Sequence, residues 1–137
     1  MASKDKNKFI DFKRLVKSFK YAIAGLKSSL DDEQNIKIHF IAAFLVLILN
    51  IVLKVNVTEW IITIFLCGLV ISAELFNTAI EYVVDLATNK IEEKAKLAKD
   101  ISAGAVLSTA ITSLIIGFII YIPKIIELIG GLKWKNI

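Results

Sequence analysis

Long blocks of apolar residues limit what this chain can fold into. Residues 101–122 contain no charged side chain, and shorter apolar blocks occupy residues 38–53 and 60–73. A transmembrane helix needs about 20 apolar residues to cross the hydrocarbon core of a bilayer. Of the 137 residues, 56% are hydrophobic, whereas a soluble domain usually has roughly 45–50%. We therefore expect an all-α integral membrane protein.

The three blocks predict three transmembrane helices, at residues 35–54, 59–87 and 100–122. The second block ends at residue 73, but its helical pattern continues to residue 87 with polar residues on one side. We expect the charged segment from Thr88 to Asp100 to be a loop and Pro123 to mark the end of the last helix. We expect a single membrane-embedded domain over residues 1–137, without a separate soluble catalytic domain.

Residues 12–30 have the pattern of an amphipathic helix that lies on a membrane surface. Apolar residues recur there at helical spacing, and basic residues fall outside their stripe. The apolar residues are Phe12, Leu15, Val16, Phe19, Ile23, Leu26 and Leu30. The basic residues are Lys13, Arg14, Lys17, Lys20 and Lys27. Such a helix buries its apolar face in the interface and holds its cations near lipid phosphates. Packing on protein is the alternative.

The basic residues also predict the orientation in the membrane. Residues 1–37 carry nine Lys and Arg residues and residues 88–100 carry four, against four on the opposite side of the predicted spans. Because cytoplasmic loops are enriched in these residues, we expect the N-terminus and the 88–100 segment at the cytoplasmic face. The net charge of +4 lies beside membrane segments, which favours anionic headgroups over nucleic acid as the partner.

A row of polar side chains follows one face of the second predicted transmembrane helix. Asn77, Thr78, Glu81 and Asp85 lie 3, 4, 7 and 11 residues after Glu74, which places all five within an arc of about 100°. An ionisable residue in a membrane helix costs roughly 2.5–3.5 kcal/mol on insertion scales, so such residues usually mark function. Hydrogen bonding between helices is the alternative explanation, above all for Asn77 and Thr78.

The carboxylates of this row suit two kinds of chemistry. Near the cytoplasmic surface, Glu81 could bind Mg²⁺ together with substrate phosphates, because this ion prefers oxygen ligands. Glu74 lies deeper, where a desolvated carboxylate binds a proton more readily and can act as a general base. Lys99 and Asp100 lie at the membrane level of Asp85, where a lysine can neutralise phosphate charge. The sequence has no phosphate-binding P-loop and no protein-kinase motif, so a metal site and a proton-transfer site both stay open.

Two segments of the chain have a specific pattern: ELFNTAIEYVVD at residues 74–85 and AKDISAGAV at residues 98–106. Together they resemble the prokaryotic diacylglycerol kinase family, which includes the undecaprenol kinases of Gram-positive bacteria. Upstream positions also fit the family pattern: Arg14, Tyr21, Gly25, Leu26, Glu33, Gln34, Asn35 and His39. The resemblance covers about residues 12–123, which is nearly the whole chain.

The resemblance implies a homotrimer in the bacterial cell membrane, with one surface helix and three transmembrane helices in each subunit. It implies transfer of the γ-phosphoryl group of ATP, with Mg²⁺, to a lipid hydroxyl at sites shared between subunits. Glu74 is then the catalytic base, and Glu33 and Glu81 hold the metal. The residues that the resemblance implies at the nucleotide are Arg14, Tyr21, Lys99 and Asp100, with Asn77 in support. Residues 90–92 are implied to touch ATP as well.

The lipid substrate is expected to be undecaprenol. The segment 33–39 and the tail beyond Pro123 are more like the undecaprenol kinases, and no tryptophan stands beside Ile23, where diacylglycerol enzymes tend to carry one. Diacylglycerol is the second possibility within the family. A proton-coupled carrier would instead use Glu74 and Glu81 as a relay and would not need Glu33 for nucleotide binding. An inactive relative is disfavoured because every implied site residue is present.

Overall fold

Four helices make up the part of the chain that the structure describes. The computed structural model describes residues 11–88, 90 and 92–134. Its helices are α1 (Phe12–Asp32), α2 (Gln34–Val52), α3 (Val57–Ala87) and α4 (Glu93–Trp134). The chain divides into two compact units, one that contains α1 and one that contains α2, α3 and α4. The second is called the three-helix unit below.

α1 begins at Phe12, and the side chain of the preceding residue, Asp11, caps it. The Asp11 carboxylate accepts hydrogen bonds from the backbone N–H groups of Lys13 at 3.1 Å and Arg14 at 3.4 Å, which lack partners inside the first turn. One turn apart on α1, the Lys17 ammonium lies 5.6 Å from the centre of the Tyr21 ring, within the range of a cation–π contact. The helix expected at 12–30 is therefore present, while its place on a membrane surface stays a prediction.

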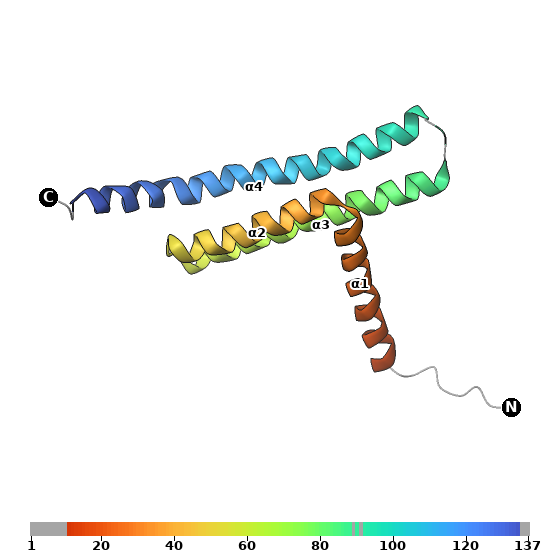
Figure 1. Ribbon diagram of the computed structural model, residues 1–137, viewed down its shortest axis with the longest axis horizontal. Coiled ribbons are helices and arrows are strands. Elements are labelled where there is room, and N and C mark those ends of the chain that lie inside the picture. The colour runs from red at the N-terminus through yellow and green to blue at the C-terminus, as the bar shows by residue number, and fades with distance from the viewer. Residues whose placement is uncertain (1–10, 89, 91, 135–137) are drawn as a thin grey trace. The chain divides into compact units, whose positions relative to one another are not determined.

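In the three-helix unit, α3 packs against both α2 and α4 (Figure 1). Short connections join these helices in turn, so neighbours along the chain run in opposite directions. The side chains of α3 that this packing buries are Thr63, Leu66, Val70, Glu74, Asn77 and Thr78. Most are spaced three or four residues apart, so they form one stripe along the helix. The polar row predicted from the sequence continues this buried stripe.

Large apolar side chains cover the outside of the three-helix unit. Phe44, Phe65, Phe76 and Ile119 are between 62% and 70% exposed. Each of the three helices is long and apolar enough to cross a membrane. An apolar surface of this extent is unfavourable in water, whereas lipid tails are as apolar as the side chains themselves. The expected all-α fold with three apolar helices that could span a membrane is confirmed.

α4 corrects the predicted bounds of the last helix. It begins at Glu93 and ends at Trp134, whereas the sequence predicted a helix from 100 to 122 after a charged loop. Residues 93–99 read EKAKLAK, and all of these residue types are strong helix formers despite their charge. Pro123 lies inside the helix; it removes one backbone donor, a loss that membrane helices tolerate when other groups satisfy the carbonyl. The bounds of α2 and α3 agree with the prediction within two residues.

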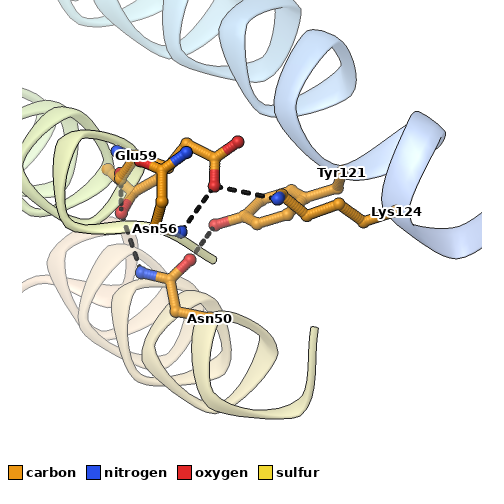
Figure 2. Close-up of polar contacts among 6 residues, drawn as sticks. Asn50, Asn56, Glu59, Tyr121 and Lys124 are labelled. Carbon is orange, nitrogen blue, oxygen red and sulfur yellow. Dashed lines mark hydrogen bonds and ion pairs between the residues drawn. The ribbon is translucent and has the colours of Figure 1, made fainter. Parts of the chain in front are cut away.

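A polar cluster, the Asn50 clamp, joins all three helices near the α2–α3 connection (Figure 2). Asn50 of α2 is fully buried. Its Nδ2 donates to Thr63 Oγ1 of α3 at 2.8 Å, and its Oδ1 accepts from the Tyr121 hydroxyl of α4 at 2.7 Å. Both ends of the amide are therefore used, and the two bonds fix the position of α2 and α4 against α3.

Glu59 adds a second polar link at the same end of the unit. Its backbone N–H donates to the Asn56 side chain at 3.0 Å, and its carboxylate accepts from the Asn56 backbone N–H at 2.7 Å. This reciprocal pair is a capping box, which satisfies donors at the start of α3. The same carboxylate lies 3.0 Å from the Lys124 ammonium of α4 (Figure 2). The start of α3 is thus tied to α4 one turn beyond Tyr121.

The Asn50 clamp leads to a prediction about stability. Tyr121→Phe removes one hydroxyl and leaves Asn50 Oδ1 without this donor, so we expect the free energy of unfolding to fall by about 1 kcal/mol. Titration of the purified protein with denaturing detergent, followed by circular dichroism, measures this change. Ser72→Ala removes a hydroxyl from an exposed position of α3 and serves as the control. Equal stability of Tyr121→Phe and wild type would show that the clamp contributes nothing.

Candidate functional site

The polar row on α3 leads from the interior of the three-helix unit toward the end that carries the 88–92 connection. Glu74, Asn77 and Thr78 are buried, with 3%, 6% and 2% of their surfaces exposed. Glu81 is half-buried and Asp85 is exposed. A deep carboxylate and a shallower one therefore share one helix face, two turns apart. The row thus passes from buried to exposed side chains along one face of α3, while its depth in the membrane stays a prediction.

Asn77 holds Glu81 in place through a short hydrogen-bonded chain. The Asn77 Nδ2 donates to Glu81 Oε1 at 3.0 Å. The Ser102 hydroxyl of α4 lies 2.6 Å from Asn77 Oδ1 and 2.9 Å from the Lys99 carbonyl oxygen. A donor at Oδ1 turns the amide so that its N–H faces the carboxylate. The arrangement therefore orients Glu81 from α4, as a supporting role for Asn77 requires.

Lys99 joins the polar row through Asp85. The Lys99 ammonium lies 2.6 Å from Asp85 Oδ1, so α4 contributes a cation at the exposed end of the row. Asp100, the next residue, is exposed. The structure thus brings Asn77, Glu81 and Lys99 together, while their roles at a nucleotide stay a prediction.

An open cavity of about 440 Å³ lies at this end of the unit, beside the 88–92 connection. Three lysines line it, namely Lys90, Lys96 and Lys99, together with Asp85 and Glu92. Several ammonium groups around one cavity attract phosphate oxygens. Of the residues 90–92 that were expected to touch a nucleotide, Lys90 and Glu92 line this cavity and Ile91 lies outside the described residues.

Glu74, the expected catalytic base, faces α2. The Nε2 atom of His39 lies 3.8 Å from its Oε2 atom, and His39 is half-buried. The Thr78 hydroxyl donates to the backbone carbonyl of Glu74 at 3.1 Å rather than to its carboxylate. The buried carboxylate is thus shielded from water and lies beside the imidazole of α2.

Two residues of this site, His39 and Ser102, received no role in the sequence analysis. The sequence contained a hint of both. His39 is the only histidine of the chain and one of two polar residues that interrupt the apolar block 38–53. Ser102 lies one helical turn after Lys99. The other interruption is Asn50, which forms the clamp. Polar residues in an apolar block need partners, and a single sequence does not say on which helix those partners lie.

Three further expected site residues belong to α1 or stand directly before α2. Glu33 precedes α2 in an extended backbone conformation, and its side chain makes no capping hydrogen bond. Arg14 and Tyr21 lie on α1, in the other unit, so their part in a common site stays a prediction. Among the described residues, no three His, Cys, Asp or Glu side chains gather as a metal site. Two carboxylates that hold Mg²⁺ together with substrate phosphates do not require such a group.

Comparison with known proteins places the chain in a family. Residues 20–121 match the family described as prokaryotic diacylglycerol kinase. The chain is 42% identical to the undecaprenol kinase of Bacillus subtilis, over 91% of this chain and the full length of that protein. It is 36% identical to the diacylglycerol kinase of Synechocystis, over 83% of this chain and 66% of the relative. It is 29% identical to the diacylglycerol kinase of Escherichia coli K12, over 80% of this chain and 89% of the relative.

The family match includes the whole polar row, His39 and the Lys99–Ser102 segment of α4. A kinase of this family takes its phosphoryl group from a nucleotide, and the lysine-lined cavity has the charge to attract one. The polar site, the apolar helices around it and the match over residues 20–121 together show that this chain belongs to the prokaryotic diacylglycerol kinase family and is a lipid kinase.

Proposed function

We propose that this lipid kinase transfers the γ-phosphoryl group of MgATP to the hydroxyl of undecaprenol and so produces undecaprenyl phosphate. The identity to the undecaprenol kinase of Bacillus subtilis, 42%, exceeds the 36% and 29% found for two diacylglycerol kinases, which favours this lipid. Diacylglycerol is the second candidate, because several relatives carry that name. The observation that carries the proposed reaction is the deeply buried Glu74 on the same helix face as the Asn77–Glu81 pair.

Glu74 is proposed as the general base. Glu74 is 3% exposed, so water competes little with a lipid hydroxyl for its carboxylate. As the hydroxyl oxygen bonds to the γ-phosphorus, its proton passes to a Glu74 oxygen and the bond to the departing ADP breaks. Phosphoryl transfer depends mainly on positioning and charge stabilisation. The 3.8 Å distance to His39 gives Glu74 a neighbour that can hold its orientation.

Glu81 and Glu33 are proposed to hold Mg²⁺. Glu81 is oriented by Asn77, and the Glu33 carboxylate is not used for helix capping; both offer the oxygen ligands that Mg²⁺ prefers. When bound, MgATP supplies the phosphoryl group and the metal offsets part of its charge. Lys99, with Lys90 and Lys96 around the same cavity, is proposed to attract the phosphates. Asp100, Arg14 and Tyr21 complete the proposed nucleotide site.

We further propose a homotrimer in the bacterial cell membrane, with α1 on the membrane surface and the active sites at the cytoplasmic face. In the most apolar 18-residue stretch of α4 only 6% is buried, whereas 33% of the corresponding stretch of α3 is buried. α4 thus offers apolar surface both to lipid and to neighbouring subunits. The excess of Lys and Arg residues in 1–37 and 88–100 supports the orientation.

Phosphate transfer from labelled ATP tests the proposed function. Purified protein in mixed micelles is given undecaprenol or diacylglycerol side by side, with and without Mg²⁺. We expect Mg²⁺-dependent transfer with a clear preference for undecaprenol. Preference for diacylglycerol would keep the mechanism and replace the lipid. Transfer to neither lipid would contradict both lipid assignments.

Glu74→Gln tests the base. The amide keeps the shape of the side chain but cannot accept the proton, so we expect turnover to fall by about two to four orders of magnitude. ATP binding, measured by calorimetry in the same micelles, should remain close to that of wild type. Glu127→Gln changes an exposed glutamate of α4 and is the matched control. A Glu74→Gln enzyme with near-normal turnover would rule out this role.

Ser102→Ala tests the link from α4 to Glu81. Without the 2.6 Å bond to Asn77 Oδ1, the amide is free to turn, and we expect kcat/KM for MgATP to fall about tenfold, which corresponds to about 1.4 kcal/mol. Ser102→Thr keeps the hydroxyl and should restore most of the activity. Ser108→Ala, which removes an exposed hydroxyl of the same helix, should leave the kinetics unchanged. Equal kinetics of both alanine variants would remove Ser102 from the site.

A further inference from the structure

A second cavity, almost entirely apolar, lies between α2, α3 and α4. Its volume is about 300 Å³, and its lining is a different set of residues from the lysine-lined cavity. On α4 the lining runs from Ala110 to Tyr121, which is about 16 Å along a helix. Small residues on two helices make the space, among them Ala42 on α2 and Ala110 and Gly117 on α4.

The two ends of this apolar cavity differ in chemistry. At one end the lining includes His39, whose Nε2 atom lies 3.8 Å from the carboxylate of Glu74. At the other end it includes Thr63 and Tyr121, both of which are hydrogen-bonded to Asn50 in the clamp (Figure 2). The cavity therefore leads from the neighbourhood of the proposed base to a polar cluster that closes it.

We propose that this apolar cavity holds the part of the lipid alcohol's hydrocarbon chain that lies next to the hydroxyl, and that Gly117 and Tyr121 limit how far this part can enter. The proposal rests on the proposed function, because a hydroxyl that reaches Glu74 brings its chain to the His39 end of the cavity. The walls, built from residues such as Leu66, Val70 and Leu114, offer such a chain apolar contacts along its length.

The volume favours a lipid chain over a helix of a second copy. About 300 Å³ lies at the lower end of the range for small-ligand sites, roughly 300–1,000 Å³. A helix with its side chains is about 10–12 Å wide, so two turns of it, about 11 Å long, occupy roughly 1,000 Å³. The first few isoprene units of a polyprenol fit the measured space, whereas a helix segment does not.

Gly117 allows this space to be filled without disturbing the backbone. A Cβ atom placed there would meet the Tyr121 ring carbons at 3.8 Å, which is an ordinary van der Waals contact. A leucine side chain at this position would therefore extend into the cavity. Gly68 on α3 is exposed, has nothing within 4 Å of a Cβ atom, and does not line the cavity. Gly68→Leu thus adds the same atoms to a transmembrane helix outside the cavity and is the matched control.

The test combines chain-length selectivity with direct labelling. Wild type, Gly117→Leu and Gly68→Leu are compared in phosphorylation of undecaprenol and of geraniol, a short isoprenoid alcohol. Each is also irradiated with a polyprenol that carries a diazirine in its chain, and the labelled residues are identified by peptide mass spectrometry. We expect Gly117→Leu to lower kcat/KM for undecaprenol by about tenfold or more, with less effect on geraniol wherever geraniol is phosphorylated. The label should appear on Leu66 and Leu114 in wild type and Gly68→Leu, and decrease in Gly117→Leu.

Other outcomes separate this proposal from the proposed function. Label outside the cavity lining, or an equal loss for both alcohols in Gly117→Leu, would overturn the proposed chain site. Absence of label from the lining, combined with a changed oligomeric state of Gly117→Leu on native gels, would overturn it in favour of a second copy. Label on Leu66 and Leu114 without phosphate transfer by wild type would support the chain site and overturn the proposed kinase substrate.

Discussion

The three-helix unit depends on the need to keep the polar side chains of α3 away from lipid. Glu74, Asn77 and Thr78 lie on one face of an otherwise apolar helix and are almost fully buried. An unpaired polar group costs several kcal/mol in hydrocarbon, so this face must be covered. α2 and α4 cover it and contribute the polar groups that it needs. The packing of the helices and the assembly of the site are thus consequences of one constraint.

Polar contacts at both ends of α3 leave an apolar interior between them. The Asn50 clamp and the Glu59–Lys124 pair join the helices near the α2–α3 connection, and the Asn77–Ser102 and Asp85–Lys99 contacts join them near the 88–92 connection. Between these contacts, small side chains leave the apolar cavity. A lipid kinase must bring a charged nucleotide and an apolar chain together, and this arrangement separates the environments that suit them.

Part of the fold and of the site follows from sequence alone, and the wrong bounds predicted for α4 have a clear physical origin. The polar row was predicted from spacing, and the bounds of α2 and α3 from the apolar blocks. The length of α4 was not predicted correctly. The charged residues 93–99 were interpreted as a loop before the helix, and Pro123 was interpreted as its end. Alternating Glu, Lys, Ala and Leu residues have high helix propensity whether or not they lie in a membrane. Hydropathy reports where lipid begins, which is not where a helix begins.

The sequence by itself determined which residues share a face of α3, because the period of a helix is a local property of the backbone. It also determined the family, through the motifs at 74–85 and 98–106. Only the tertiary structure decided the partners of that face: Ser102 lies 25 residues from Asn77, and Tyr121 lies 71 residues from Asn50. Such contacts depend on which sides of two helices meet. That choice is made by packing over the whole unit and is not encoded in the period of either helix.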